Sequence, residues 1–255
     1  MSFFITIFLC IVFFLVFEGL HRWLHISVEF SRKLVHVSSA AGMALLPYFL
    51  SKIEILAVCF ILFAILLASR YLHLNEPKYD NGCRILARLR DKFQNLISGA
   101  GRFLRWLNVY RGVHSIERKT LGELYFPIGV ALSAFIFLPA SAPTLVSGQA
   151  NIVLFQFGVL VMGFADAMAA IIGVHYGKHK FAFTRDKKSV EGSSAFLITT
   201  FLILLLFNFF SIKVRLSGFL ILPIVLSFLE LILSFGLDNL ILPIVASFLL
   251  GVFIL

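Results

Sequence analysis

The chain is poor in charged residues and in cysteine, and both shortages narrow the class of protein. Only 14% of its 255 residues are charged, 60% are hydrophobic, and the mean hydropathy is +0.98. Soluble domains carry about 25% charged residues, so this composition argues against a soluble domain and predicts a polytopic membrane protein. The three cysteines (Cys10, Cys59 and Cys83) are far apart and lack a CxxC motif. They support neither a disulfide framework nor a zinc site.

Positive charge is also missing from the first residues. No Lys or Arg precedes Arg22, so the basic n-region of a cleaved signal peptide is absent and residues 2–20 are expected to form a first membrane span.

The sequence also lacks a standard nucleotide-binding motif. The segment 173–178, GVHYGK, has three residues between its glycines where a Walker A motif needs four, and His179 replaces its Ser or Thr. His175 and His179 lack an HExxH context, which favours surface or structural histidines.

Eight apolar runs come close to the length that a helix needs to cross a hydrocarbon core of about 30 Å. They cover 2–20, 34–50, 53–69, 121–138, 152–172, 193–210, 216–235 and 240–255. The predicted fold class is therefore all-α, a polytopic integral membrane helical bundle with about eight transmembrane helices. We expect a single transmembrane domain over 1–255.

The basic residues predict the orientation of these spans. All of the 22 Lys and Arg residues except Lys52, Lys213 and Arg215 fall in loops on one side, which makes that side cytoplasmic and places both termini outside. The same asymmetry explains the net charge of +9 without nucleic acid. Within the long loop 73–118, apolar residues recur at helical spacing beside a basic row, which predicts a cytoplasmic amphipathic helix in the headgroup region.

The segment 163–192 carries the most informative polar residues. Asp166 lies inside the apolar run 152–172, where an ionised carboxylate costs at least about 2.5 kcal/mol, so it should be paired, metal-bound or facing a wet cavity. Asp166, Gly173 and Gly177 share one helix face that is almost bare of side chains. Another helix, or a ligand with its metal ion, can approach such a face closely.

A basic loop follows this face and includes Lys178, Lys187 and Lys188. Cations on flexible backbone beside a carboxylate that can hold Mg²⁺ suit a polyphosphate, so 163–192 is predicted to be a nucleotide phosphate site at the membrane surface. Two alternatives stay open. The cations can simply mark a cytoplasmic loop, and Asp166 can serve transport or helix pairing.

Other unusual polar residues are predicted to reach the same cytoplasmic face and to form one site with Asp166. They are Arg32, Lys33, His36, Arg118, Lys119, Glu123, Glu230, Asp238 and Asn239.

Taken together, these residues resemble the CTP-dependent polyprenol kinase family, which includes dolichol, phytol and farnesol kinases and the CTP-dependent diacylglycerol kinase. The residues that carry the resemblance are the run 32–36, the segments 122–123 and 125–127, Asp166 with Gly173, Gly177 with Lys178, the run 187–192, and Asp238 and Asn239 with Pro243. The resemblance extends from the second span to the last. Its most specific part, 166–192, is shared with phosphatidate cytidylyltransferases, whose C-terminal signature we do not find here.

The resemblance implies transfer of the γ-phosphate of CTP to the hydroxyl of a membrane isoprenoid alcohol, with Mg²⁺, at the cytoplasmic face. It implies catalytic roles for Asp166, Asp238 and Lys188, and metal binding by Asp166 and Glu191. The residues implied in CTP binding are Lys178, Lys187, Lys188, Ser189, Glu191, Gly192, Gly173, Gly177, Arg32, Lys33, His36 and Asn239.

The expected partners are thus CTP, a lipid alcohol and membrane lipid, without nucleic acid. The expected location is the cell membrane of a prokaryote, or the endoplasmic reticulum or an organelle membrane of a eukaryote. Three other functions remain open: a CTP-dependent diacylglycerol kinase, a CDP-lipid synthase like the phosphatidate cytidylyltransferases, and an ion-coupled transporter that uses Asp166 and Glu230. The sequence leaves open which alcohol is used and how many copies assemble.

Overall fold

The computed structural model describes residues 3–9, 12, 16, 28–74, 121–139, 149–182, 184, 188–210 and 212–254. These residues form helices and no strand, apart from two isolated bridges, so the all-helical class is confirmed. The elements are α2 (Val28–Leu45), η1 (Leu46–Tyr48), α3 (Lys52–Leu74), α6 (Gly122–Phe137), α7 (Gln149–Leu160), η3 (Val161–Ala165), α8 (Asp166–Tyr176), α9 (Val190–Phe210), α10 (Leu216–Ile232) and α11 (Asp238–Phe253). The predicted amphipathic helix, beyond the end of α3, and Lys187 lie outside the described residues.

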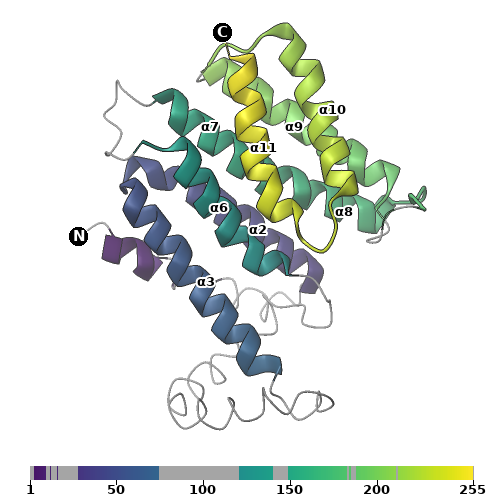
Figure 1. The fold of residues 1–255 in the computed structure, drawn as a ribbon. Coiled ribbons are helices and arrows are strands. Elements are labelled where there is room, and N and C mark those ends of the chain that lie inside the picture. The colour runs from purple at the N-terminus through teal and green to yellow at the C-terminus, as the bar shows by residue number, and fades with distance from the viewer. Residues whose placement is uncertain are drawn as a thin grey trace.

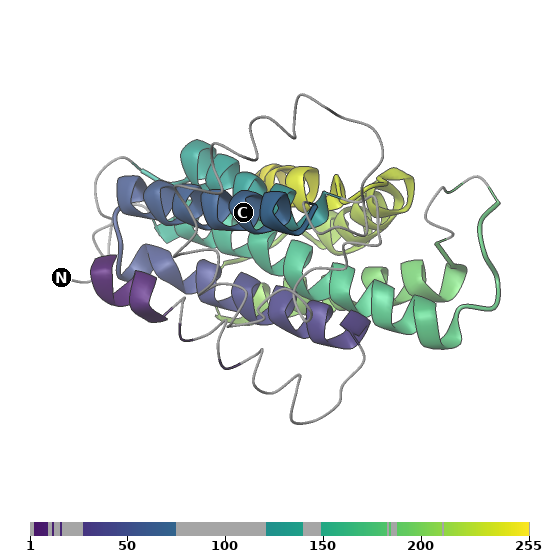
Figure 2. The same ribbon diagram turned by 90° about the horizontal axis from the view of Figure 1, so that it is seen from below.

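The helices lie side by side in a bundle (Figure 1). Helix α11 packs against α6, α7 and α10, while α9 packs against α8 and α10, and α2 packs against α7 and η3. Seen after a turn of 90° (Figure 2), residues 3–9 and α8 lie at opposite ends of the bundle. The side chains of Phe155, Phe157 and Phe196 are fully buried in its core.

Two helices are long and apolar enough to cross a membrane, Ala150–Tyr176 with 27 residues and Val190–Phe210 with 21. The first is the continuous run of α7, η3 and α8, and it contains the whole predicted span 152–172. Helices α6, α10 and α11 are apolar but have 16 or 17 residues, which corresponds to about 24–26 Å. Eight membrane spans therefore remain a prediction.

A tight turn before α11 fixes the start of that helix. Phe235 and Gly236 have left-handed backbone conformations, with φ of 61° and 85°, and a side chain on Gly236 would collide with the backbone of Gly122. Glycine is therefore required where this turn packs on the first residue of α6. The contact is reinforced by Asn239, whose Nδ2 donates to the Gly122 carbonyl at 3.0 Å.

Candidate active site

Asp166 begins α8 directly after the π-helical turn η3, which separates α8 from α7. A π-helical turn accommodates one extra residue within a helix and is frequent at functional sites. The carboxylate is buried between α8 and α2, where Lys33 Nζ lies 2.5 Å from Asp166 Oδ2. The two side chains are only 7% and 9% exposed, so the ion pair is shielded from water.

His36, one turn after Lys33, approaches the same carboxylate. Its Nε2 lies 3.7 Å from Asp166 Oδ2 and 3.4 Å from the carbonyl oxygen of Met162. The ring packs edge-on against Phe126 of α6 with 4.9 Å between centroids. The π-helical turn and α2 thus place one acid, one cation and one imidazole together.

A second ion pair joins α9 to the end of α10. Lys188 Nζ donates to Glu230 Oε1 at 2.6 Å and also to the Glu230 carbonyl, and lies 3.9 Å from Asp238 Oδ2. Glu230 is buried. Because Lys188 precedes α9 and Asp238 begins α11, this contact ties three helices together.

Asp238, which precedes the apolar run 240–255, connects the two ion pairs electrostatically. Burial and the negative charge of Asp166 raise the pKa of its carboxyl group to about 6, while Lys188 and Lys33 oppose the rise. The Asp238 carboxylate itself lies 3.9 Å from Lys188 Nζ, beside the second ion pair. We call the set of Lys33, His36, Asp166, Lys188, Glu230 and Asp238 the charged cluster.

Helix α9 packs on the bare face of α8. A side-chain carbon on Gly192 would lie 3.2 Å from the Cα of Gly173, so glycine permits this close approach. Ser189 Oγ, which is buried, accepts a hydrogen bond from the Gly192 amide at 3.1 Å and so caps the start of α9. The predicted role of Ser189 in CTP binding is not tested by this hydrogen bond, which leaves the hydroxyl hydrogen available as a donor.

The loop between α8 and α9 folds back on itself as a short hairpin. Phe181 donates to the Lys188 carbonyl and Val190 to the His179 carbonyl, each at 2.9 Å. Glu191, predicted as a metal ligand, binds the His179 ring at 2.7 Å. Lys178 is exposed on this hairpin, at the same end of the bundle as α8.

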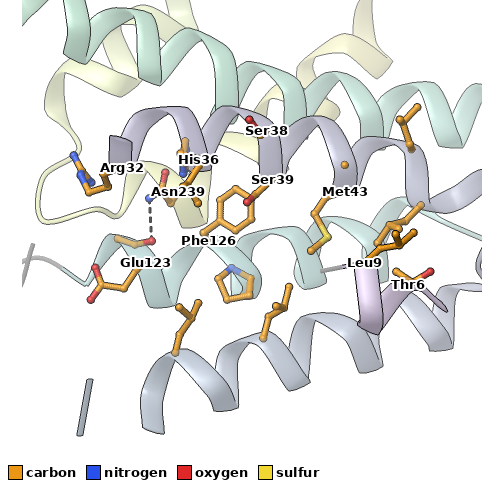
Figure 3. Close-up of a pocket in the computed structure, with 18 of the residues that line it drawn as sticks. Thr6, Leu9, Arg32, His36, Ser38, Ser39, Met43, Glu123, Phe126 and Asn239 are labelled. Carbon is orange, nitrogen blue, oxygen red and sulfur yellow. Dashed lines mark hydrogen bonds between the residues drawn. The ribbon is translucent and has the colours of Figure 1, made fainter. Parts of the chain in front are cut away.

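A cavity of about 600 Å³ lies between α2, α3, α6 and residues 5–9. Figure 3 shows Arg32, His36, Glu123 and Asn239 at one end, and Met43 and Leu9 toward the other. Three residues implied in CTP binding, Arg32, His36 and Asn239, thus line this cavity. His36 belongs to both the cavity wall and the charged cluster.

Two curated proteins are similar to this chain. Phytol kinase of Synechocystis sp. is 24% identical over 133 residues, which is 52% of this chain and 51% of that protein. Dolichol kinase of Schizosaccharomyces pombe is 37% identical over 84 residues, 33% of this chain and 15% of that protein. Both matches support an assignment to the CTP-dependent polyprenol kinase family. The matched region is about half the length of the phytol kinase and a smaller part of the dolichol kinase. No family model and no solved structure matches.

The polyprenol kinase assignment implies Mg²⁺, and the oxygen atoms of the site fit such an ion. Within the described ranges, the buried atoms Glu230 Oε2 and Asn239 Oδ1 have no hydrogen-bond partner, and carboxylate and amide oxygens are ligands for hard cations. No group of three or more His, Cys, Asp or Glu side chains in that part of the chain is placed to hold a metal.

Proposed function

We propose that the protein is a kinase that transfers the γ-phosphate of CTP to the hydroxyl group of an isoprenoid alcohol dissolved in the membrane. The names of the two relatives support the reaction class. The observation that carries the proposal is the buried Asp166 carboxylate beside His36, which lines an apolar cavity. This arrangement places a proton acceptor where charged phosphates and an apolar acceptor can meet.

The charged cluster suits phosphoryl transfer, which is catalysed mainly by positioning and charge neutralisation. The Lys33 ammonium has three donors, so it can hold Asp166 and a phosphate oxygen together, and Lys188 can do the same beside Glu230. Lys178 and Lys187 would bind CTP from the aqueous side of the hairpin. Mg²⁺ would be held by Asp166, Glu230 or Asn239 with the phosphates, and it supplies charge neutralisation when bound.

In the transfer step, the alcohol oxygen forms a bond to the γ-phosphorus. The bond from that phosphorus to the oxygen shared with the β-phosphate breaks, and CDP leaves. Asp166 accepts the hydroxyl proton, directly or through His36. His36 is suited to this relay because its ring faces both the carboxylate and the cavity.

The proposed setting is a multi-pass membrane protein with about eight spans and its site at the cytoplasmic face. The apolar outer surfaces of α9 and α10 support it, since Phe209, Leu216 and Phe228 point outward, and large exposed apolar surfaces mark contact with lipid or protein. The predicted topology also brings the basic hairpin to the side from which CTP comes.

The test uses purified protein in lipid or detergent with γ-labelled CTP and Mg²⁺. The acceptors are farnesol, phytol, a long polyprenol and diacylglycerol. We expect label in a prenyl monophosphate, and we expect it to disappear in Asp166→Asn. Glu54→Gln is the matched control, because among the described residues the Glu54 carboxylate accepts its hydrogen bonds from Ser51, just before α3, and this variant should keep full activity.

Other results point to other functions. Label on diacylglycerol alone indicates a diacylglycerol kinase, and transfer of CMP from α-labelled CTP to phosphatidate indicates a cytidylyltransferase. An Asp166→Asn variant with wild-type turnover refutes the role of the carboxylate.

A further inference from the structure

The cavity follows one face of α2 over most of that helix. The lining residues on this face include Arg32, His36, Ser39, Gly42, Met43 and Leu46. From Arg32 to Leu46 the chain rises by about 21 Å at 1.5 Å per residue. The hydrocarbon part of one bilayer leaflet is about 15 Å deep, half of the 30 Å core. The cavity is therefore long enough to receive a lipid tail across a whole leaflet.

The two ends of the cavity differ in chemistry. Arg32, His36 and Glu123 line the end beside the charged cluster, whereas Met43 and Leu9 lie toward the other end (Figure 3). An alcohol with a long hydrocarbon chain has the same polarity, a single polar group at one end. The match in polarity orients such a molecule with its hydroxyl group toward His36.

Among the residues that the structure describes, the side chains at the apolar end are exposed. Leu45, Phe49 and Leu9 line it and are 54%, 68% and 58% exposed. A chain longer than the cavity can leave the protein there and continue in the lipid. A water-soluble ligand would make no favourable polar contact with these three side chains, since all three are apolar.

We propose that this cavity binds the hydrocarbon tail of the acceptor alcohol, and that Gly42 determines which chain lengths fit. The proposal rests on the kinase function above for the identity of the acceptor. Gly42 lies six residues beyond His36, about 9 Å along the helix. Gly42 is exposed and lines the cavity, and a Cβ atom there would meet nothing within 4 Å among the described residues, so a larger side chain can be added to the cavity wall at this point without a collision.

Gly42→Leu is a sharp test because its effects on stability and on substrate binding are opposite. Leucine favours a helix more than glycine does, and it meets no clash here, so the thermal midpoint should be unchanged or higher. The side chain blocks the cavity beyond about 9 Å. We expect kcat/KM for phytol to fall about tenfold or more, while the value for the shorter geraniol stays close to wild type.

The matched control is Gly251→Leu on α11. Gly251 is exposed and a Cβ there would make only ordinary contacts with Leu154, at 3.6 and 3.7 Å. This variant makes the same residue change in an apolar helix without touching the cavity. It should keep the wild-type preference among geraniol, farnesol and phytol. If Gly42→Leu leaves that preference unchanged as well, the tail does not occupy the cavity.

A second measurement needs no turnover. A prenyl alcohol with a photoreactive diazirine at its tail end is irradiated with the purified protein, and labelled peptides are identified by mass spectrometry. Label on α2, α3 and α6 that disappears in Gly42→Leu supports the cavity, even if the wild-type protein phosphorylates nothing and the kinase proposal fails. If the protein is an active kinase but the outer surfaces of α9 and α10 are labelled as strongly as α2, α3 and α6, the tail-binding proposal is refuted while the kinase proposal stands.

Discussion

The buried ion pair between Lys33 and Asp166 makes a quantitative prediction about stability. Each side chain is less than a tenth exposed, so Lys33→Met or Asp166→Leu leaves the partner buried without its counter-charge. Breaking a buried pair in this way costs about 3–5 kcal/mol. The double variant removes both charges and keeps similar volumes, and such replacements are often neutral or stabilising. The coupling energy, the sum of the two single losses minus the loss in the double variant, should therefore reach about 6–10 kcal/mol.

The assay is thermal unfolding of the four proteins in the same detergent. For a chain of this size 1 kcal/mol corresponds to about 2–4 °C, so each single variant should lose roughly 6–20 °C and the double variant should return close to wild type. Lys178→Met removes an exposed cation and should leave the midpoint unchanged. If the double variant loses as much stability as the two single variants together, the two side chains do not form a coupled ion pair. All variants that lack Asp166 should be inactive, including the stable one, which separates catalysis from folding.

Three further changes address the rest of the site. Lys188→Met leaves the buried Glu230 carboxylate without its cation, so it should lower stability by about 3 kcal/mol and raise the KM for CTP; an unchanged KM would remove Lys188 from the nucleotide site. Gly236→Ala places a side chain at φ 85° against Gly122 and should lower the free energy of unfolding by about 1–2 kcal/mol or more. The loss is measured as a lower thermal midpoint, and a more stable variant would refute the requirement for glycine in this turn. Ser189→Ala removes the cap of α9 and should cost about 1 kcal/mol; if CTP binding weakens in equilibrium titrations well beyond this loss, Ser189 also contacts the nucleotide.

The helical class could be predicted from the sequence because apolar runs of helical length leave few alternatives. The run 152–172 does form one helix, Ala150–Tyr176. Span ends were less predictable, since α3 continues to Leu74 past the predicted end at residue 69. Hydropathy falls gradually at this end of the run, so it does not mark a boundary, whereas the helix itself continues as long as its backbone hydrogen bonds are formed.

For the site, the sequence indicated which residue types should gather but not which side chains contact one another. A carboxylate in an apolar run needs a partner, and Lys33 and His36 were among the residues expected to gather with Asp166. The sequence does not say which cation makes the contact across 133 positions, nor that Lys188 takes Glu230. The cavity was missed because it forms where side chains are small or absent. Ser39 and Gly42, small residues on one face of α2, were the signal.

The π-helical turn η3 makes the position of Asp166 depend on chain length as well as on residue type. One residue advances a helix by about 100°. The π-helical turn absorbs its extra residue locally, whereas one more residue inserted ahead of Asp166 as regular α-helix would rotate α8 by that angle against α7, and Asp166 would turn away from Lys33 while its own identity stayed the same. The bare glycine face would turn with it and lose its contact with α9. Such an insertion is therefore as damaging to the site as replacing the carboxylate, although every residue of the charged cluster would still be present.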